Sequence, residues 1–329
     1  MSRKVLLAAA ALALVLAGAW AVKPGAPARV EVPEGLSARQ TAELLGAKGV
    51  VQSVFVFRAL LKITGFDRHL KPGTYILRIH EWPTIVARKL TLGLTDDLKI
   101  TIPEGFRASQ VAERLEKAGI VDAREFLALV SARKLEGRLF PSTYNFPAGY
   151  GAERVIRKMT QEFERRAGPL YLAARSQAEL TLDQVVTLAS IVERESSVSA
   201  EKPMIAAVYL NRLRRRMRLQ SVPTVQYALG HWKKEFDATD VTVDSPYNTY
   251  IRYGLPPGPI CSPGLDSIAA VLSPAAGDAL YLMADGKGAN VFSATNEEHV
   301  RNRRRYEKKM RAAKEELKKQ ARSGAVPAR

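Results

Sequence analysis

Apolar and polar positions recur in the same order in two stretches of the chain that lie about 70 residues apart. Residues 30–35 (VEVPEG) parallel residues 100–105 (ITIPEG), and residues 86–91 (VARKLT) parallel residues 155–160 (VIRKMT). Further identities keep this order: Ala38, Gln40, Ala42, Leu45, Gly49, Val51, Pro72, Thr74 and Tyr75 recur as Ala108, Gln110, Ala112, Leu115, Gly119, Val121, Pro141, Thr143 and Tyr144. So many ordered matches indicate an internal repeat.

Each copy of the repeat has the pattern of one α+β module. A short β-branched strand ends at the Pro-Glu-Gly turn, and apolar residues at helical spacing follow it, such as Val111, Leu115 and Ile120. A second helix, a strand with the Thr-Tyr pair and a closing helix complete the unit. The sequence therefore predicts tandem modules at residues 29–95 and 96–165, although repetition alone also fits two spacers.

The pattern changes near residue 180. Residues 184–195 (QVVTLASIVERE) predict an apolar helix with Asp183 as its N-cap, and a second helix is predicted at residues 202–217. The following stretches, at residues 220–227, 245–250 and 254–264, are rich in Pro, Gly and polar side chains and predict stiff loops. We interpret residues 166–300 as one mixed α+β domain and residues 301–329 as a separate basic tail.

The N-terminus predicts the compartment. Residues 5–22 are 18 uncharged and mostly apolar positions, preceded by Arg3 and Lys4. As a helix they would span about 27 Å, enough for the core of a bilayer, and the positive flank would keep residues 1–4 in the cytoplasm. A cleaved signal peptide ending near Ala21 is the alternative. Both interpretations export the body, and residues 23–28 then form a linker.

Charge adds a preference for anionic surroundings. The net charge is +17, and residues 301–329 contain 12 Lys or Arg against 3 Glu. Such a run is usually a solvated helix or a frayed terminus. A membrane-linked nucleic-acid binder is the competing interpretation, but export and the single aromatic residue of the tail, Tyr306, argue against it. We expect no nucleic-acid partner.

Cysteine and histidine usage indicates no metal or disulfide chemistry. Cys261 is the only cysteine, so no intramolecular disulfide can form, and the four histidines are scattered without metal-ligand spacing. We therefore expect neither a metal ion nor a cofactor.

Two carboxylates end the helix at residues 184–195. Glu193 and Glu195 are two positions apart, which places them about 200° apart around a helix, so they point to opposite sides. They cannot flank one substrate as a catalytic pair does. If one of them does chemistry, the other is a salt-bridge or packing partner; spacing alone also fits two solvated side chains.

The polar loops predict the walls of a cleft. Gln220, Thr224, Tyr247, Asn248 and Tyr250 combine hydrogen-bonding groups with flat apolar surfaces, the mixture that sugars require. Neighbouring Pro and Gly residues would fix the loops and lower the ordering cost of binding. The alternative is that these residues only stabilise turns.

Several runs resemble the signature of the endolytic murein transglycosylases of the YceG-like family. They are residues 139–144 (LFPSTY), 188–196 (LASIVERES), 208–213 (VYLNRL), 217–220 (MRLQ), 223–225 (PTV), 247–250 (YNTY), 254–257 (GLPP) and 263–264 (PG). The resemblance covers nearly the whole chain and includes the N-terminal anchor. Two departures stand out: Val222 occupies a position that is often acidic in the family, and Asn290 one that is often His.

The resemblance implies a site and a reaction. The family's catalytic glutamate precedes Ser or Thr and corresponds to Glu195, with Glu193, Ser196 and Asn211 in supporting positions; the modules would be a LysM-like region and its continuation. The enzyme would cleave the bond between N-acetylmuramic acid and N-acetylglucosamine without water, leave 1,6-anhydro ends and set the length of nascent strands. The implied partners are peptidoglycan glycan strands, the bacterial inner membrane and peptidoglycan synthases, with a periplasmic body. A non-catalytic, membrane-anchored peptidoglycan-binding scaffold is the alternative.

Overall fold

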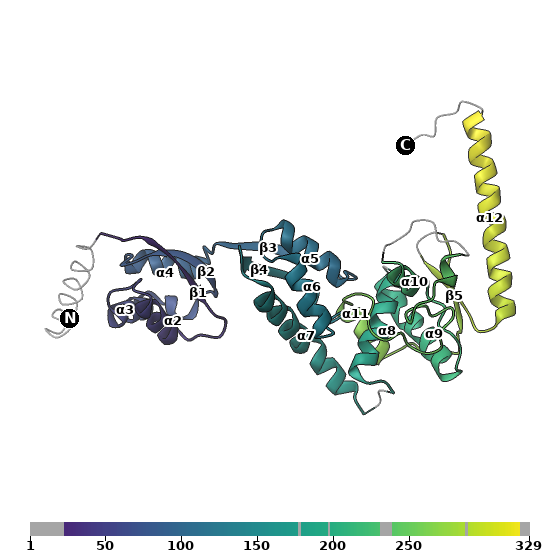
Figure 1. The fold of residues 1–329 in the computed structure, drawn as a ribbon, viewed down its shortest axis with the longest axis horizontal. Helices are drawn as coiled ribbons and strands as arrows, with labels where there is room; N and C mark the ends of the chain where they lie inside the picture. Colours follow the sequence, from purple (N-terminus) through teal and green to yellow (C-terminus); the bar gives the residue numbers. More distant parts are fainter. Residues whose placement is uncertain (1–22, 177–178, 197, 231–238, 287–288, 323–329) are drawn as a thin grey trace. The chain divides into compact units, whose positions relative to one another are not determined.

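A computed structural model describes residues 23–176, 179–196, 198–230, 239–286 and 289–322, and within them the chain is a mixed α+β protein (Figure 1). Two compact units are present. Of the described residues, the first unit contains 23–100, 118–120 and 143–150, and the second contains the others. The predicted anchor at residues 5–22 lies outside the described residues, and no described helix is long and apolar enough to cross a membrane.

The first copy of the repeat forms a two-stranded sheet covered by helices. Strand β1 (Pro27–Val32) pairs antiparallel with β2 (Gly73–Arg78), with Val30 opposite Tyr75. The other elements are α2 (Ala38–Ala47), α3 (Val54–Thr64), the 3-10 helix η1 (Phe66–Arg68) and α4 (Pro83–Leu92). Alternate strand residues are buried, because one face of a half-covered sheet packs on the core. That core contains Val30, Val32, Leu45, Phe57, Leu61, Tyr75, Leu77 and Leu90.

The second copy has the same order of elements, but they divide between the two units. Strands β3 (Asp97–Thr101) and β4 (Thr143–Pro147) pair with each other and belong almost wholly to the first unit. Helices α5 (Ala108–Lys117), α6 (Ala123–Ala132) and α7 (Ala152–Ala174) belong to the second. The LysM-like character of the modules and the domain boundaries drawn from the sequence stay predictions.

Three helices form the centre of the second unit. They are α8 (Leu182–Glu195), α9 (Lys202–Arg214) and α11 (Leu265–Leu272), which pack against one another (Figure 1). Eight consecutive residues of α8, 185–192, are buried. A helix that is buried all round is a central helix of its domain, and α8 thereby carries its last residue, Glu195, to the edge of the core.

Shorter elements surround these helices. They are the 3-10 helices η2 (Ser199–Glu201) and η3 (Asp240–Thr242), helix α10 (Val222–Ala228), the antiparallel strands β5 (Tyr281–Ala284) and β6 (Asn290–Ser293), and helix α12 (Asn296–Arg322). The only cysteine of the chain, Cys261, is fully buried, and its thiol contacts the carbonyl oxygen of Ser190 at 3.4 Å.

Two local predictions are wrong. The N-cap of α8 is Thr181, not Asp183: the Thr181 hydroxyl accepts from the Gln184 N–H, and the Gln184 side chain accepts from the Thr181 N–H. This reciprocal pair satisfies two free donors at the helix start. Asp183, two residues later, is already inside the helix and cannot be its N-cap. Residues 220–227, expected as a loop, contain α10, which begins at Val222 and has Pro223 in its first turn, where proline is tolerated.

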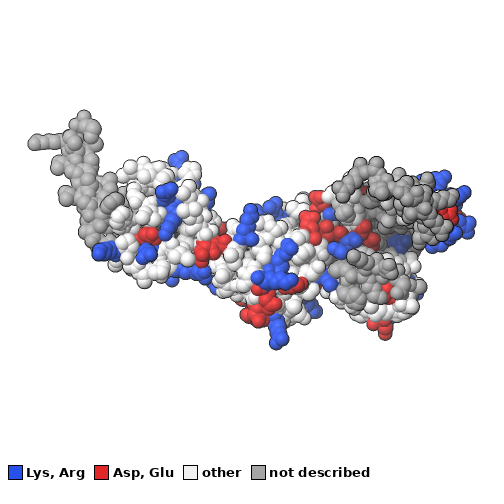
Figure 2. Space-filling model, turned by 90° about the horizontal axis from the view of Figure 1, so that it is seen from above, with Lys and Arg blue, Asp and Glu red and all other residues white. Residues whose placement is uncertain are grey.

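Basic and acidic side chains are mixed on the face of the molecule seen in Figure 2. In α12 the first turns contact β5 and β6, and Asn302 donates to the Ser293 hydroxyl at 3.1 Å. The side chains of residues 307–312 are exposed, which agrees with a solvated tail helix.

Candidate active site

The Glu195 carboxyl is held by two hydroxyl groups. Glu195 is the last residue of α8 and is partly buried. The Tyr209 phenol of α9 donates to its Oε1 at 2.5 Å, and the Ser221 hydroxyl, from the N-cap of α10, donates to the same oxygen at 2.6 Å. No described residue donates to Oε2. The carboxyl therefore has one fixed oxygen and one that is open to another partner.

This surrounding favours a protonated carboxyl. Burial raises the pKa of Glu195 above its ordinary range, because the charged form loses solvation. The hydrogen bonds from Ser221 and Tyr209, together with the positive charge of Arg212, oppose part of this rise in pKa. Burial also raises the pKa of the Tyr209 phenol, which therefore remains a hydrogen-bond donor. A carboxylic acid with a raised pKa can act as a proton donor near neutral pH.

Glu193 has a different neighbourhood. Its carboxyl accepts from the Lys202 ammonium at 3.1 Å, from the Gly264 N–H at 3.0 Å and from the Ser267 hydroxyl at 2.6 Å. Both members of the ion pair are buried, with side-chain exposures of 9% for Glu193 and 3% for Lys202. These bonds join α8 to α9 and to the start of α11, and they leave Glu193 paired rather than available to a substrate.

Two of the five predicted cleft residues lie close to Glu195. Burial, and then the charge of Glu195, raise the pKa of the Tyr250 phenol. Gln220 is exposed and immediately precedes Ser221, and its side-chain oxygen accepts from Arg212 at 3.3 Å. Arg212 is buried and donates through Nε to the Leu280 carbonyl at 2.6 Å.

The other three predicted cleft residues have bonds within the protein. Asn248 is fully buried and donates to the carbonyls of Val241 and Val243 at 2.9 and 2.8 Å. Thr224 is fully buried, and its hydroxyl donates to the Ser221 carbonyl at 2.7 Å. The Tyr247 ring lies 4.8 Å from that of Tyr227 and is partly buried. None of the three contacts the Glu195 carboxyl.

The remaining predicted residues support the surrounding backbone. The Ser196 hydroxyl donates to the Glu201 carboxylate at 3.1 Å and not to Glu195. The same carboxylate accepts a hydrogen bond from the side chain of Asn290 at 2.8 Å. Asn290 is the residue at the position where the family often has His. Asn211 donates to the carbonyls of Gly277 and Ala279 at 3.0 and 3.1 Å. These contacts tie the chain after α8 to β6, and α9 to the segment before β5.

Sequence patterns did not predict Tyr209, Ser221 and Arg212 as the surroundings of Glu195. Tyr209 lies in the helix predicted at residues 202–217, and a buried phenol needs a partner for its hydroxyl. That requirement was the available signal. Arg212 stood within a run of arginines, and nothing in the run distinguished the one buried member from its exposed neighbours.

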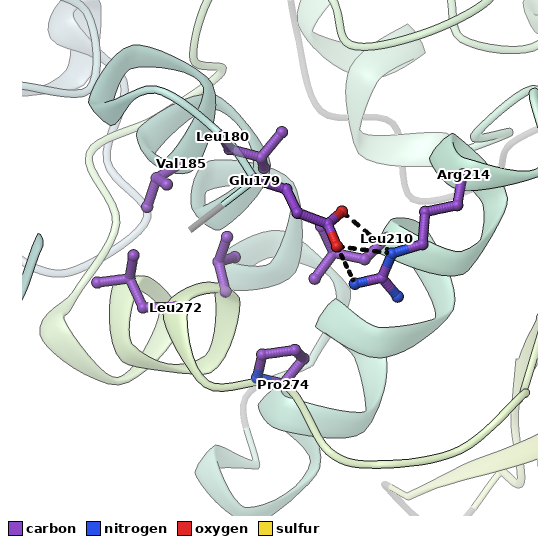
Figure 3. A pocket seen from close by; sticks show the side chains of 8 residues that line it. Glu179, Leu180, Val185, Leu210, Arg214, Leu272 and Pro274 are labelled. Carbon is purple, nitrogen blue, oxygen red and sulfur yellow. Dashed lines mark hydrogen bonds and ion pairs between the residues drawn. The ribbon is translucent and has the colours of Figure 1, made fainter. Parts of the chain in front are cut away.

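A separate pocket lies away from Glu195. It is lined by Leu180, Val185, Leu210, Val271, Leu272 and Pro274, with the ion pair of Glu179 and Arg214 beside them (Figure 3). Val185 is near the beginning of α8, whereas Glu195 ends it. Among the described residues, no group of three or more His, Cys, Asp or Glu is arranged to hold a metal ion.

The fold and the site define a class: an α+β protein in which a central helix ends in a partly buried carboxyl of raised pKa, Glu195. Comparison with known proteins then gives the family. The sequence model of the YceG-like family matches residues 30–305, and the chain belongs to that family.

Its relatives include two curated proteins that are named endolytic murein transglycosylase. The one from Bacillus subtilis is 30% identical over 84% of this chain and 84% of its own length. The one from Streptococcus pneumoniae is 31% identical over 83% of this chain, which spans only 57% of that longer protein. A crystal structure of a putative YceG-like protein from Listeria monocytogenes matches with a TM-score of 0.55 at 32% identity, over 84% of this chain and 98% of the other.

Proposed function

We propose that the chain is an endolytic murein transglycosylase, a lyase that cleaves peptidoglycan glycan strands without water. The names of the relatives support the activity. The observation that carries it to this chain is the contrast between the two carboxyls at the end of α8. Glu195 has a raised pKa and an Oε2 that accepts from no described residue, whereas Glu193 is bound to Lys202, Gly264 and Ser267. A reaction that needs one carboxyl in two successive roles fits this arrangement, and Glu193 is not available as the second carboxylate of a hydrolysis.

The two roles balance in protons. Glu195 first gives its proton to the oxygen that joins N-acetylmuramic acid to N-acetylglucosamine, and the C1–O bond breaks. The resulting carboxylate then accepts the proton of the C6 hydroxyl of the muramic sugar, whose oxygen bonds to C1. The product is a 1,6-anhydro end, and Glu195 is protonated again. Neither water nor a covalent enzyme intermediate takes part.

Mass spectrometry of the products tests the activity. Purified full-length protein in detergent is incubated with uncrosslinked glycan strands, and the new ends are analysed. We expect new 1,6-anhydro-muramic ends, formed by cleavage at internal positions of the strands. New reducing ends would indicate hydrolysis and contradict the proposal, while intact strands with retained binding would indicate the scaffold function.

We also propose a single-pass location in the inner membrane, with the body in the periplasm and peptidoglycan synthases as neighbours. The support is the uncharged stretch at residues 5–22 behind Arg3 and Lys4. We expect the mature protein to stay in the membrane fraction after a carbonate wash and to keep its N-terminal segment. An N-terminus that begins near residue 22, with the protein in the soluble fraction, would instead identify a cleaved signal peptide.

A further inference from the structure

The two oxygens of the Glu195 carboxyl have unequal surroundings, and this inequality carries an inference that rests on the proposed function. Oε1 accepts hydrogen bonds from Tyr209 and Ser221, whereas Oε2 accepts none from any described residue. We propose that Tyr209 and Ser221 are positioning residues that fix Oε1, so that Oε2 alone gives and receives the proton in both steps of the reaction.

Hydrogen-bond chemistry supports this division of roles. In the neutral acid one oxygen carries the proton and the other is a carbonyl oxygen with two lone pairs. Both donors point to Oε1, so the carbonyl form is stabilised there and the proton resides on Oε2. When Oε2 loses its proton, the same two bonds stabilise the carboxylate. The carboxyl therefore needs no rotation between the first and the second proton transfer.

Ser221 is presented by a backbone that is itself fixed. Gln220 has a φ of 53°, a left-handed conformation that is uncommon for a residue with a side chain. Thr249 holds it there: its carbonyl accepts from the Gln220 N–H at 3.1 Å, and its hydroxyl accepts from the Ser221 N–H at 3.0 Å. The Thr224 hydroxyl lies 2.8 Å from that of Thr249. Strained conformations of this kind persist at functional sites because the surroundings enforce them.

Tyr209 is buried on α9, and Arg212 of the same helix is bonded to the segment that precedes Ser221. The Tyr209 side chain is 2% exposed. Arg212, one turn later on α9, donates through Nη1 to the carbonyl of Leu219 at 2.7 Å, just before the Gln220–Ser221 turn. The guanidinium thus connects the helix that carries one donor to the turn that carries the other. Both donors approach Oε1 from elements whose relative positions are fixed within the second unit.

The pH profile of kcat/KM separates positioning from general structural support. Glu195 must be protonated to begin the reaction, so activity falls as the pH rises through its pKa. Donors to a carboxylate favour the charged form and lower its pKa, so removal of either donor raises the pKa. For Tyr209→Phe and for Ser221→Ala we expect the alkaline limb to move to higher pH by about one unit. We also expect kcat to fall about 10- to 100-fold while KM stays within about twofold.

Ser267→Ala is the matched control. It removes a serine hydroxyl bond of the same 2.6 Å length, but from Glu193 instead of Glu195. We expect its alkaline limb to stay where the wild-type limb lies. The thermal midpoint of every variant is measured first. If Tyr209→Phe does not fold, the pH profile of Ser221→Ala alone tests the inference. The inference is overturned if the alkaline limb of a folded Ser221→Ala protein stays at the wild-type pH. It is also overturned if the alkaline limb of Ser267→Ala shifts as far as that of Ser221→Ala. If the wild-type protein produces no anhydro ends, the proposed function itself fails.

Discussion

The substitution Glu195→Gln is expected to lower kcat for the formation of 1,6-anhydro ends by about three orders of magnitude or more. The amide oxygen of Gln can accept the hydrogen bonds from Tyr209 and Ser221. The amide has no acidic proton to donate, however, and it does not accept a proton in the second step. General acid–base groups contribute about 10²- to 10⁴-fold to rates, and here one group serves both steps. The measurement is the rate of new anhydro ends by mass spectrometry, with binding to glycan strands measured in parallel.

Glu193→Gln is the control for this substitution, because it changes the same chemical group two residues away on α8. Its activity, normalised to the folded fraction, should stay within about tenfold of the wild type. The reason is that the Glu193 carboxylate already accepts hydrogen bonds from Lys202, Gly264 and Ser267. The opposite pattern, an active Glu195→Gln protein and an inactive but folded Glu193→Gln protein, would transfer the catalytic role to Glu193.

The substitution Lys202→Met is expected to lower the free energy of unfolding of the second unit by about 3–5 kcal/mol. The ammonium of Lys202 lies 3.1 Å from Glu193, and both side chains are buried. Its removal leaves a buried carboxylate without its counter-charge, which costs much more than the loss of an exposed pair. The measurement is the denaturant midpoint, followed by a probe attached to the second unit.

Two further variants make this result specific. The double substitution Glu193→Gln with Lys202→Met removes both charges and should recover part of the lost stability. Lys117→Ala breaks the exposed pair of Lys117 and Glu113, whose side chains are 75% and 61% exposed, and should cost less than about 1 kcal/mol. A Lys202→Met midpoint no lower than that of Lys117→Ala would show that the buried pair does not stabilise the unit.

Helical periodicity and the repeat predicted what depends on local sequence. The helix at residues 184–195 and the opposite directions of its two glutamates follow from a period of 3.6 residues, and the structure shows Glu193 and Glu195 with separate partners. The order of elements in each module follows from the same kind of pattern. The mixed α+β class could therefore be predicted before any three-dimensional information.

Side-chain partners could not be predicted in this way. Thr224 and Asn248 have the chemistry of sugar ligands, but the fold buries both, and their hydrogen bonds go to nearby backbone and hydroxyl groups. Ser221 looks no different from them in the sequence, yet its hydroxyl reaches Glu195 from 26 positions away. Tertiary contacts decide whether a polar side chain of a loop faces the site or bonds to nearby backbone. These contacts leave no periodic pattern in the sequence, so they could not be predicted from it.

The burial of Cys261 makes the chain, in effect, a thiol-free protein. Burial raises the pKa of its thiol well above the ordinary range, so the reactive thiolate hardly forms. Reagents that modify exposed cysteines should leave the native fold untouched. A cysteine introduced at any exposed position, such as Phe55 in the first unit or Leu172 in the second, would then be the unique attachment point for a label. Two introduced cysteines, one in each unit, would allow the distance between the units to be measured in solution with no other change to the sequence.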